Sequence, residues 1–254
     1  MMKYFFVPAK FLPEGVGFKL YGAAHLIWLA ALGLMCLGMV LLYRRLGKTG
    51  RSRFAKGIAV FLLSCEILRD IYIVAAGGWE WDYLPLHPCS FTMFIIAIWA
   101  FKPNDICGQI LYGFGMIGAL CALLFCNWTT QPLLHFQTIY SFIFHGILVG
   151  FVLMAVIGGD IKPKRRGFIY VAVFIAIAGS LTAVVNHILP DVNFFFTNEG
   201  SEGSPLELFI KLFGTPWWLF AYAALAAVVI GCEFLPWSGK NVKASAAEKE
   251  TVRI

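Results

Sequence analysis

Charged residues are scarce in this sequence: they make up 13% of its 254 residues, whereas hydrophobic residues make up 60%. A soluble domain carries about 25% charged residues, so this chain has too little polar surface to fold around a core in water. Its mean hydropathy of +0.78 favours a polytopic membrane protein. The expected fold class is all-α, with residues 1–254 forming a single integral membrane domain.

Several motifs are absent as well. The sequence has no CxxC pair and no cysteine spacing typical of a secreted disulfide framework. It contains no Walker loop, GxSxG elbow or HExxH helix. Its first apolar run lacks a small-residue cleavage site, so no removable signal peptide is expected. The last apolar stretch has no lysine, which argues against a retinal Schiff base.

Apolar stretches dominate what is present. A membrane span needs about 20 apolar residues, and seven stretches qualify as spans of a seven-transmembrane-helix bundle. They are residues 23–43, 57–76, 85–101, 106–126, 137–157, 168–189 and 215–235. The third is short, and residues 238–254 are polar and expected to form a flexible cytoplasmic tail.

The basic residues predict the orientation of these spans. Fifteen of the 20 lysine and arginine residues fall in the loops and tail on one side, and four fall on the other. Because basic loops stay in the cytoplasm, the N-terminus is expected outside and the C-terminus inside, in a multi-pass plasma membrane protein. The net charge of +6 is spread over short loops, so it does not predict nucleic-acid binding.

Polar residues gather in the outer half of the predicted bundle. Glu66, Arg69 and Asp70 lie inside the second span, where each charge costs about 2.5–3.5 kcal/mol to insert. Glu66 and Asp70 share a helix face, and Arg69 can reach Glu66. Two interpretations stay open for these three charges: a neutralised structural cluster, or the polar wall of a cavity open to the outer leaflet.

The stretch LPLHPCSF places three informative residues at the start of the third span. Proline is favoured at the first helical position, so Pro88 predicts that His87 caps the helix and that Cys89 sits in its first turn. Free N–H groups there favour a thiolate and can hold an oxyanion. A cysteine nucleophile needs a base, and His145 and His187 are candidates at similar depth.

Other interpretations of these residues remain open. A lone cysteine in an apolar helix more often serves packing, and a disulfide from Cys89 to Cys126 is a second alternative. Zinc ligation by the histidines and Cys89 is a further alternative, although their spacing matches no local zinc pattern. His25 is expected to make hydrogen bonds at a helix end, and the pair Asn186 and His187 to cap a helix or orient other groups.

The chain resembles the YwaF-type integral membrane proteins, which are related to the transmembrane protein 164 acyltransferases. The resemblance is carried by HLIWL with His25, LPLHPCS with Cys89, FHG with His145, and NFFFT with Asn193, followed by SPLELFIKLFGTPWWLF. It implies that Cys89 is a nucleophile and His145 a base that move acyl chains between phospholipids. Pro88, the NFFFT version of its motif and the acidic insert NEGSEGS depart from the family pattern.

The resulting hypothesis is a membrane-embedded lipid acyltransferase or acyl hydrolase that uses Cys89 and His145 in an outer-leaflet cavity. Its expected partner is a membrane phospholipid or lysophospholipid, and it requires no cofactor or metal. The supporting residues are His87, Asn186, His187, Glu66, Arg69, Asp70, His25 and Asn193. The alternatives are a small-molecule or ion transporter or ligand sensor that uses the same cavity, and a zinc-dependent seven-helix lipid hydrolase.

Overall fold

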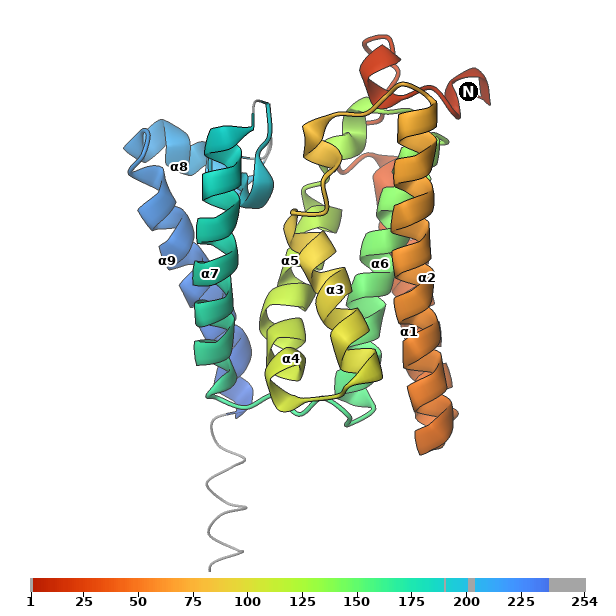
Figure 1. Ribbon diagram of the computed structural model, residues 1–254, viewed down its shortest axis with the longest axis vertical. Helices are drawn as coiled ribbons and strands as arrows, with labels where there is room; N and C mark the ends of the chain where they lie inside the picture. Colours follow the sequence, from red (N-terminus) through yellow and green to blue (C-terminus); the bar gives the residue numbers. More distant parts are fainter. Residues whose placement is uncertain (1, 190, 201–203, 238–254) are drawn as a thin grey trace, which may run out of the picture.

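A computed structural model describes residues 2–189, 191–200 and 204–237 as helices that run side by side and are joined by loops (Figure 1). None of these residues lies in a β-strand, so the all-α prediction is confirmed for the described chain. The predicted tail at 238–254 lies outside the described residues.

Nine α-helices carry the fold in the part of the chain that the structure describes. Their bounds are α1 Ala23–Arg45, α2 Lys48–Ala75, α3 Pro88–Phe101, α4 Asp105–Ile110, α5 Met116–Leu124, α6 Phe136–Ile157, α7 Gly167–Ile188, α8 Pro205–Phe213 and α9 Trp218–Phe234 among the described residues. A π-helical turn, Leu111–Gly115, joins α4 to α5 into one rod. Short 3-10 turns lie at Met2–Tyr4, Ala9–Phe11, Trp81–Tyr83, Asn127–Thr130, Phe194–Phe196 and Leu235–Trp237.

Within the described residues, six segments are long and apolar enough to cross a membrane. They are Ala23–Arg45, Trp81–Phe101, Asp105–Thr130, Phe136–Ile157, Gly167–Ile188 and Trp218–Trp237. The remaining predicted span, 57–76, is helical within α2. It falls outside this set because Glu66, Arg69 and Asp70 interrupt its apolar stretch.

Helix α6 forms the centre of the bundle. Two glycines on it leave room for α1 to pack closely. A Cβ at Gly146 would lie 2.6 Å from Leu32 Cδ2, and one at Gly150 would lie 2.6 Å from Met39 Sδ. This Gly-x-x-x-Gly spacing lets two helix backbones approach closely. Side chains that stack across the gap, such as Trp28 on Phe142 at 4.9 Å, then fill the space beside it.

The two ends of the bundle carry different connections. The upper end in Figure 1 holds residues 2–22 and the loops 76–87, 125–135 and 191–200. The lower end holds the connections 46–47, 102–104 and 158–166. At the lower end Arg51 donates to the carbonyls of Tyr43, Leu46 and Gly158. One arginine thereby satisfies carbonyls that two helix ends leave without intrahelical partners.

Candidate active site

The upper start of α3 has the local structure that its sequence predicts. Pro88 occupies the first turn of α3 and His87 is its N-cap residue, so that interpretation of LPLHPCSF is confirmed. The His87 side chain does not cap the helix. Its Nε2 instead donates to the Asp82 carbonyl at 2.9 Å and lies 3.4 Å from the Asp82 carboxylate, while its ring packs edge-on against Phe194.

Cys89 follows Pro88 in this first turn and carries a free, half-buried thiol. The Ser90 N–H in the same turn donates to the His87 carbonyl at 3.0 Å. The charges of Glu66 and Arg69 on α2 lie close enough to act on the Cys89 thiol electrostatically. Cys126 is free too, and its sulfur lies 3.7 Å from His25 Nε2. The structure therefore contains no Cys89–Cys126 disulfide.

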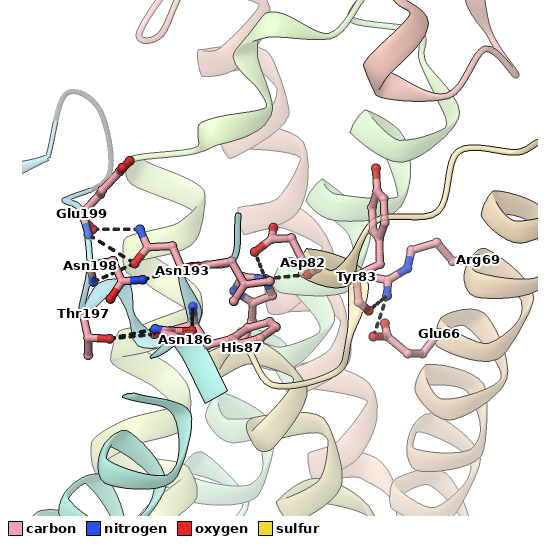
Figure 2. Close-up of polar contacts among 12 residues, drawn as sticks. Glu66, Arg69, Asp82, Tyr83, His87, Asn186, Asn193, Thr197, Asn198 and Glu199 are labelled. Atoms are coloured by element: carbon pink, nitrogen blue, oxygen red, sulfur yellow. Dashed lines mark hydrogen bonds and ion pairs between the residues drawn. The ribbon is translucent and has the colours of Figure 1, made fainter. Parts of the chain in front are cut away.

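An ion pair on α2 lies close enough to Cys89 to act on it electrostatically. Arg69 Nη2 is 2.9 Å from the Glu66 carboxylate and 2.7 Å from that of Asp70, as predicted for the first pair from helix spacing. The same guanidinium donates to the Tyr83 carbonyl at 3.3 Å (Figure 2). The Tyr140 hydroxyl of α6 donates to the other Glu66 oxygen, so this cluster ties α2 to α6.

His145 lies on α6 with one ring nitrogen engaged and the other free. Its Nδ1 is 2.7 Å from the Ser141 carbonyl, and because a carbonyl only accepts, Nδ1 carries the proton and Nε2 keeps its lone pair. The buried ring stacks on Trp128 with centroids 5.2 Å apart. No hydrogen bond joins Cys89 to an imidazole within the described part of the chain.

Two other buried histidines have both ring nitrogens occupied. His25 Nδ1 accepts from the Tyr21 N–H and its Nε2 donates to the Leu123 carbonyl at 2.8 Å, which matches its predicted helix-end role. His135 Nδ1 accepts from the Gln137 N–H and its Nε2 donates to the Val7 carbonyl at 2.7 Å. Burial lowers the pKa of His135, and the Val7 carbonyl partly offsets that shift.

The side chains of Asn186 and His187 lie in different surroundings, although the two residues are neighbours in sequence. Asn186 is buried and binds both the N–H and the carbonyl of Phe194, at 2.9 and 2.8 Å, and also the Thr197 hydroxyl. His187 is exposed on the surface of α7. Because consecutive helical residues point about 100° apart, the exposed His187 faces away from the surroundings of Asn186, and its candidacy as a base stays a prediction from the sequence.

Asn193 holds the loop above α3 in shape rather than contacting Cys89. Its side chain accepts from the N–H groups of Asn198 and Glu199 and donates to the Glu199 carbonyl (Figure 2). The loop inserts Phe194 and Phe195, which are 0% and 5% exposed. Phe195 packs edge-on against Phe91 of α3 and adopts a positive φ of 56°.

Several polar side chains of the site were missed in the sequence. Tyr140 and Gln137 lie on α6, and Gln137 donates to the Tyr83 hydroxyl at 3.0 Å. Gln137 Oε1 and Trp128 Nε1 are buried without a hydrogen-bond partner. The signal that could have identified them in the sequence was a tyrosine and a glutamine in an apolar stretch, at the depth of Glu66.

Metal ligation finds no support in the geometry. The residues that the structure describes contain no group of three or more His, Cys, Asp or Glu side chains that could hold a metal ion. Structural and catalytic zinc sites need at least three such ligands close together. The histidines are instead engaged with backbone carbonyls or lie apart.

Comparison with known proteins gives one match. A model of the TMEM164 family matches residues 20–233, which includes α1 to α9 except for the last residue of α9. No curated protein and no solved structure matches the chain. The match agrees with the transmembrane protein 164 side of the resemblance, while the YwaF-type likeness stays a prediction. Because the matched segment covers well over half of the sequence, the chain belongs to the TMEM164 family of membrane proteins.

Proposed function

We propose that this TMEM164-family protein moves fatty acyl chains between membrane lipids, with Cys89 as the nucleophile and His145 as the base. Family membership supports a role of this kind in the membrane. The observation that carries the proposal is the presence in one bundle of a free thiol in the first turn of α3 and of a buried imidazole on α6 whose Nε2 lone pair is unoccupied.

The proposal includes the arrangement in the membrane. All seven predicted spans cross it, including α2, with the upper end outside and the lower end in the cytoplasm of a plasma membrane protein. The fifteen basic residues counted for one side support this orientation. Inside the bundle, Arg69 forms ion pairs with Glu66 and Asp70, and the Tyr140 hydroxyl donates a hydrogen bond to Glu66, which reduces the cost of placing the charges of α2 in the bilayer.

In the first step His145 Nε2 takes the Cys89 thiol proton, and the thiolate attacks the ester carbonyl of a phospholipid. The C–S bond forms as the ester C–O bond breaks, and the imidazolium returns its proton to the leaving lysolipid oxygen. The Cys89 N–H holds the oxyanion that develops between these events, because Pro88 has no N–H and the Ser90 N–H donates to the His87 carbonyl at 3.0 Å. Because catalytic hydrogen bonds often tighten only when substrate binds, the absence of a Cys89–His145 bond is compatible with this role.

In the second step the thioester passes its acyl group onward. A lysophospholipid hydroxyl, or water in a hydrolase, gives its proton to His145 Nε2 and attacks the thioester carbonyl. The C–S bond breaks and the Cys89 sulfur regains the proton from the imidazolium. Two unpartnered buried atoms, Gln137 Oε1 and Trp128 Nε1, are available to the polar groups of the bound lipid.

The test uses purified protein reconstituted in liposomes with a phospholipid labelled in one acyl chain and an unlabelled lysophospholipid acceptor. We expect transfer by the wild type, none by Cys89→Ala and a loss of at least 100-fold in His145→Gln, consistent with the usual contribution of a general base of about 10²–10⁴. Matched controls are Cys232→Ala and His187→Gln, which change exposed side chains elsewhere. Transfer by Cys89→Ala at the wild-type rate would overturn the proposal.

A transporter or ligand sensor remains the second candidate from the sequence. Intramembrane charges are typical of ion pathways, but Arg69 binds both carboxylates of this cluster within the chain. Solute uptake in the same liposomes that survives Cys89→Ala, without acyl transfer by the wild type, would replace the enzyme proposal with this one. The zinc-dependent hydrolase is not proposed, because no ligand group of the required size is found in the described residues.

A further inference from the structure

A half-open apolar groove of about 400 Å³ runs between three helices below the proposed active site. Six residues of α1 from Leu29 to Val40 form one wall, and three of α5 from Leu120 to Leu124 form the other. Three residues of α6 from Val149 to Ile157 form the floor. The volume lies in the range of about 300–1,000 Å³ that is usual for ligand sites.

The chemistry of the groove selects an apolar occupant. All twelve lining residues are apolar or glycine apart from Cys36, whose thiol lies 3.4 Å from the Gly146 carbonyl. The three helices belong to segments that are apolar enough to span a membrane. The open side of the groove therefore faces acyl chains, and no lining side chain would hold a headgroup or a polar solute.

The length of the groove suits an extended hydrocarbon chain. The wall on α1 covers eleven residue steps, a length of about 16 Å at 1.5 Å per residue. A molecule that fills the groove along this length is therefore elongated and apolar.

The floor of the groove continues toward His145. Residues 145, 149, 153 and 157 are spaced by four on α6, and such residues form one ridge along a helix. Val149, Leu153 and Ile157 line the groove, so it begins one turn below the His145 ring. Leu123, in the opposite wall, is also the residue whose carbonyl binds His25 at 2.8 Å.

We infer that this groove binds one fatty acyl chain of a membrane lipid, with the carboxyl end of that chain toward His145. The binding of an acyl chain is inferred from the groove alone, whereas the orientation of that acyl chain rests on the proposed function. Within that function, the groove measures the length of the acyl chain that is transferred.

Two glycines of α1 provide a matched pair of variants. Gly33 lines the groove and Gly38 does not, and at both positions an added Cβ would meet no atom within 4 Å. A phenylalanine at position 33 therefore projects into the groove without a backbone clash. Five residues further along, a phenylalanine at position 38 points to a different side of the helix, because five helical steps turn the side chain by about 140°.

The experiment places wild type, Gly33→Phe and Gly38→Phe in nanodiscs that contain phosphatidylcholine with a diazirine near the end of one acyl chain. After illumination, labelled peptides are mapped by mass spectrometry. We expect labelling of the α6 segment Val149–Ile157 to fall at least fivefold in Gly33→Phe and to stay at the wild-type level in Gly38→Phe. Equal labelling of this segment in all three proteins would overturn the inference.

Two further readouts keep the outcomes separate. Thermal unfolding of each variant shows whether it is folded, and if Gly33→Phe does not fold, Gly33→Leu replaces it in the same comparison. Where wild type transfers acyl groups, Gly33→Phe is expected to prefer shorter chains by at least fivefold and Gly38→Phe to keep the wild-type preference. Groove-specific labelling without any acyl transfer by the wild type would uphold the binding site and reject the proposed function.

Discussion

The upper and lower ends of the bundle both carry arginine–carboxylate networks, but they differ in burial. At the upper end, the side chains of Arg69 and Glu66 are 15% and 6% exposed, and their pair joins α2 to the Tyr140 hydroxyl of α6. At the lower end, the side chains of Arg166 and Asp105 are 61% and 36% exposed. An arginine–carboxylate pair is thus close to water at the lower end. At the upper end it is part of the interior, near the Cys89 thiol.

This difference in burial predicts different energetics. An exposed pair is screened by solvent and contributes about 0–1 kcal/mol. A buried pair contributes little relative to apolar residues of the same size, but removing one partner strands the other charge in the interior. The comparison therefore predicts that removing one partner of an ion pair destabilises the protein much more at the upper end than at the lower end.

The largest effect is expected for Arg69→Leu. This change leaves the Glu66 carboxylate buried without its ion pair, so we expect a loss of about 3–5 kcal/mol in the free energy of unfolding. Denaturation in detergent micelles measures this loss. The double variant Arg69→Leu with Glu66→Leu is expected to recover much of it, and a double variant as unstable as the single one would contradict a charge-stranding cause.

A smaller effect is expected for Asn186→Ala at the upper end. The change leaves the buried N–H and carbonyl of Phe194 without the hydrogen bonds that hold the loop above α3, at a cost of about 1–3 kcal/mol. We also expect faster alkylation of Cys89 by a soluble maleimide, because Phe194 packs on the neighbouring His87.

The control for this loop is Asn193→Ala, whose hydrogen bonds to Asn198 and Glu199 are solvent-exposed. Its effect on stability is expected to stay within about 0.5 kcal/mol. Equal alkylation rates for Cys89 in Asn186→Ala and in the wild type would show that this loop does not cover the thiol.

The smallest effect is expected for Asp105→Asn at the lower end. It removes ion pairs with Lys164 at 2.7 Å and Arg166 at 3.0 Å, both of them partly exposed. We expect a loss of about 0–1 kcal/mol, and a loss that shrinks further as salt is raised. A loss as large as that of Arg69→Leu would remove the distinction between the two ends.

Local sequence patterns predicted much of this architecture. The helices lie where seven apolar stretches were expected, because length and hydropathy are properties of single segments. The start of α3 at Pro88 was predictable from the restricted backbone of proline alone. The Arg69–Glu66 pair followed from helical spacing within one segment.

Features that depend on packing between segments were not predictable in the same way. The bond from Tyr140 to Glu66 requires α2 and α6 to lie together, and the groove requires three helices. The sequence likewise left His145 and His187 as equal candidates, and the burial of one and the exposure of the other separate them. Which histidine keeps a free nitrogen depends on neighbouring carbonyls, and composition carries no information about these.

The most direct test of the central claim is intact-protein mass spectrometry after incubation with a phospholipid and no acceptor. The account predicts that wild-type protein gains the mass of one acyl group on Cys89, that hydroxylamine removes it, and that His145→Gln gains it far more slowly. An acyl group found on another residue, or turnover by Cys89→Ala without any adduct, would contradict the account.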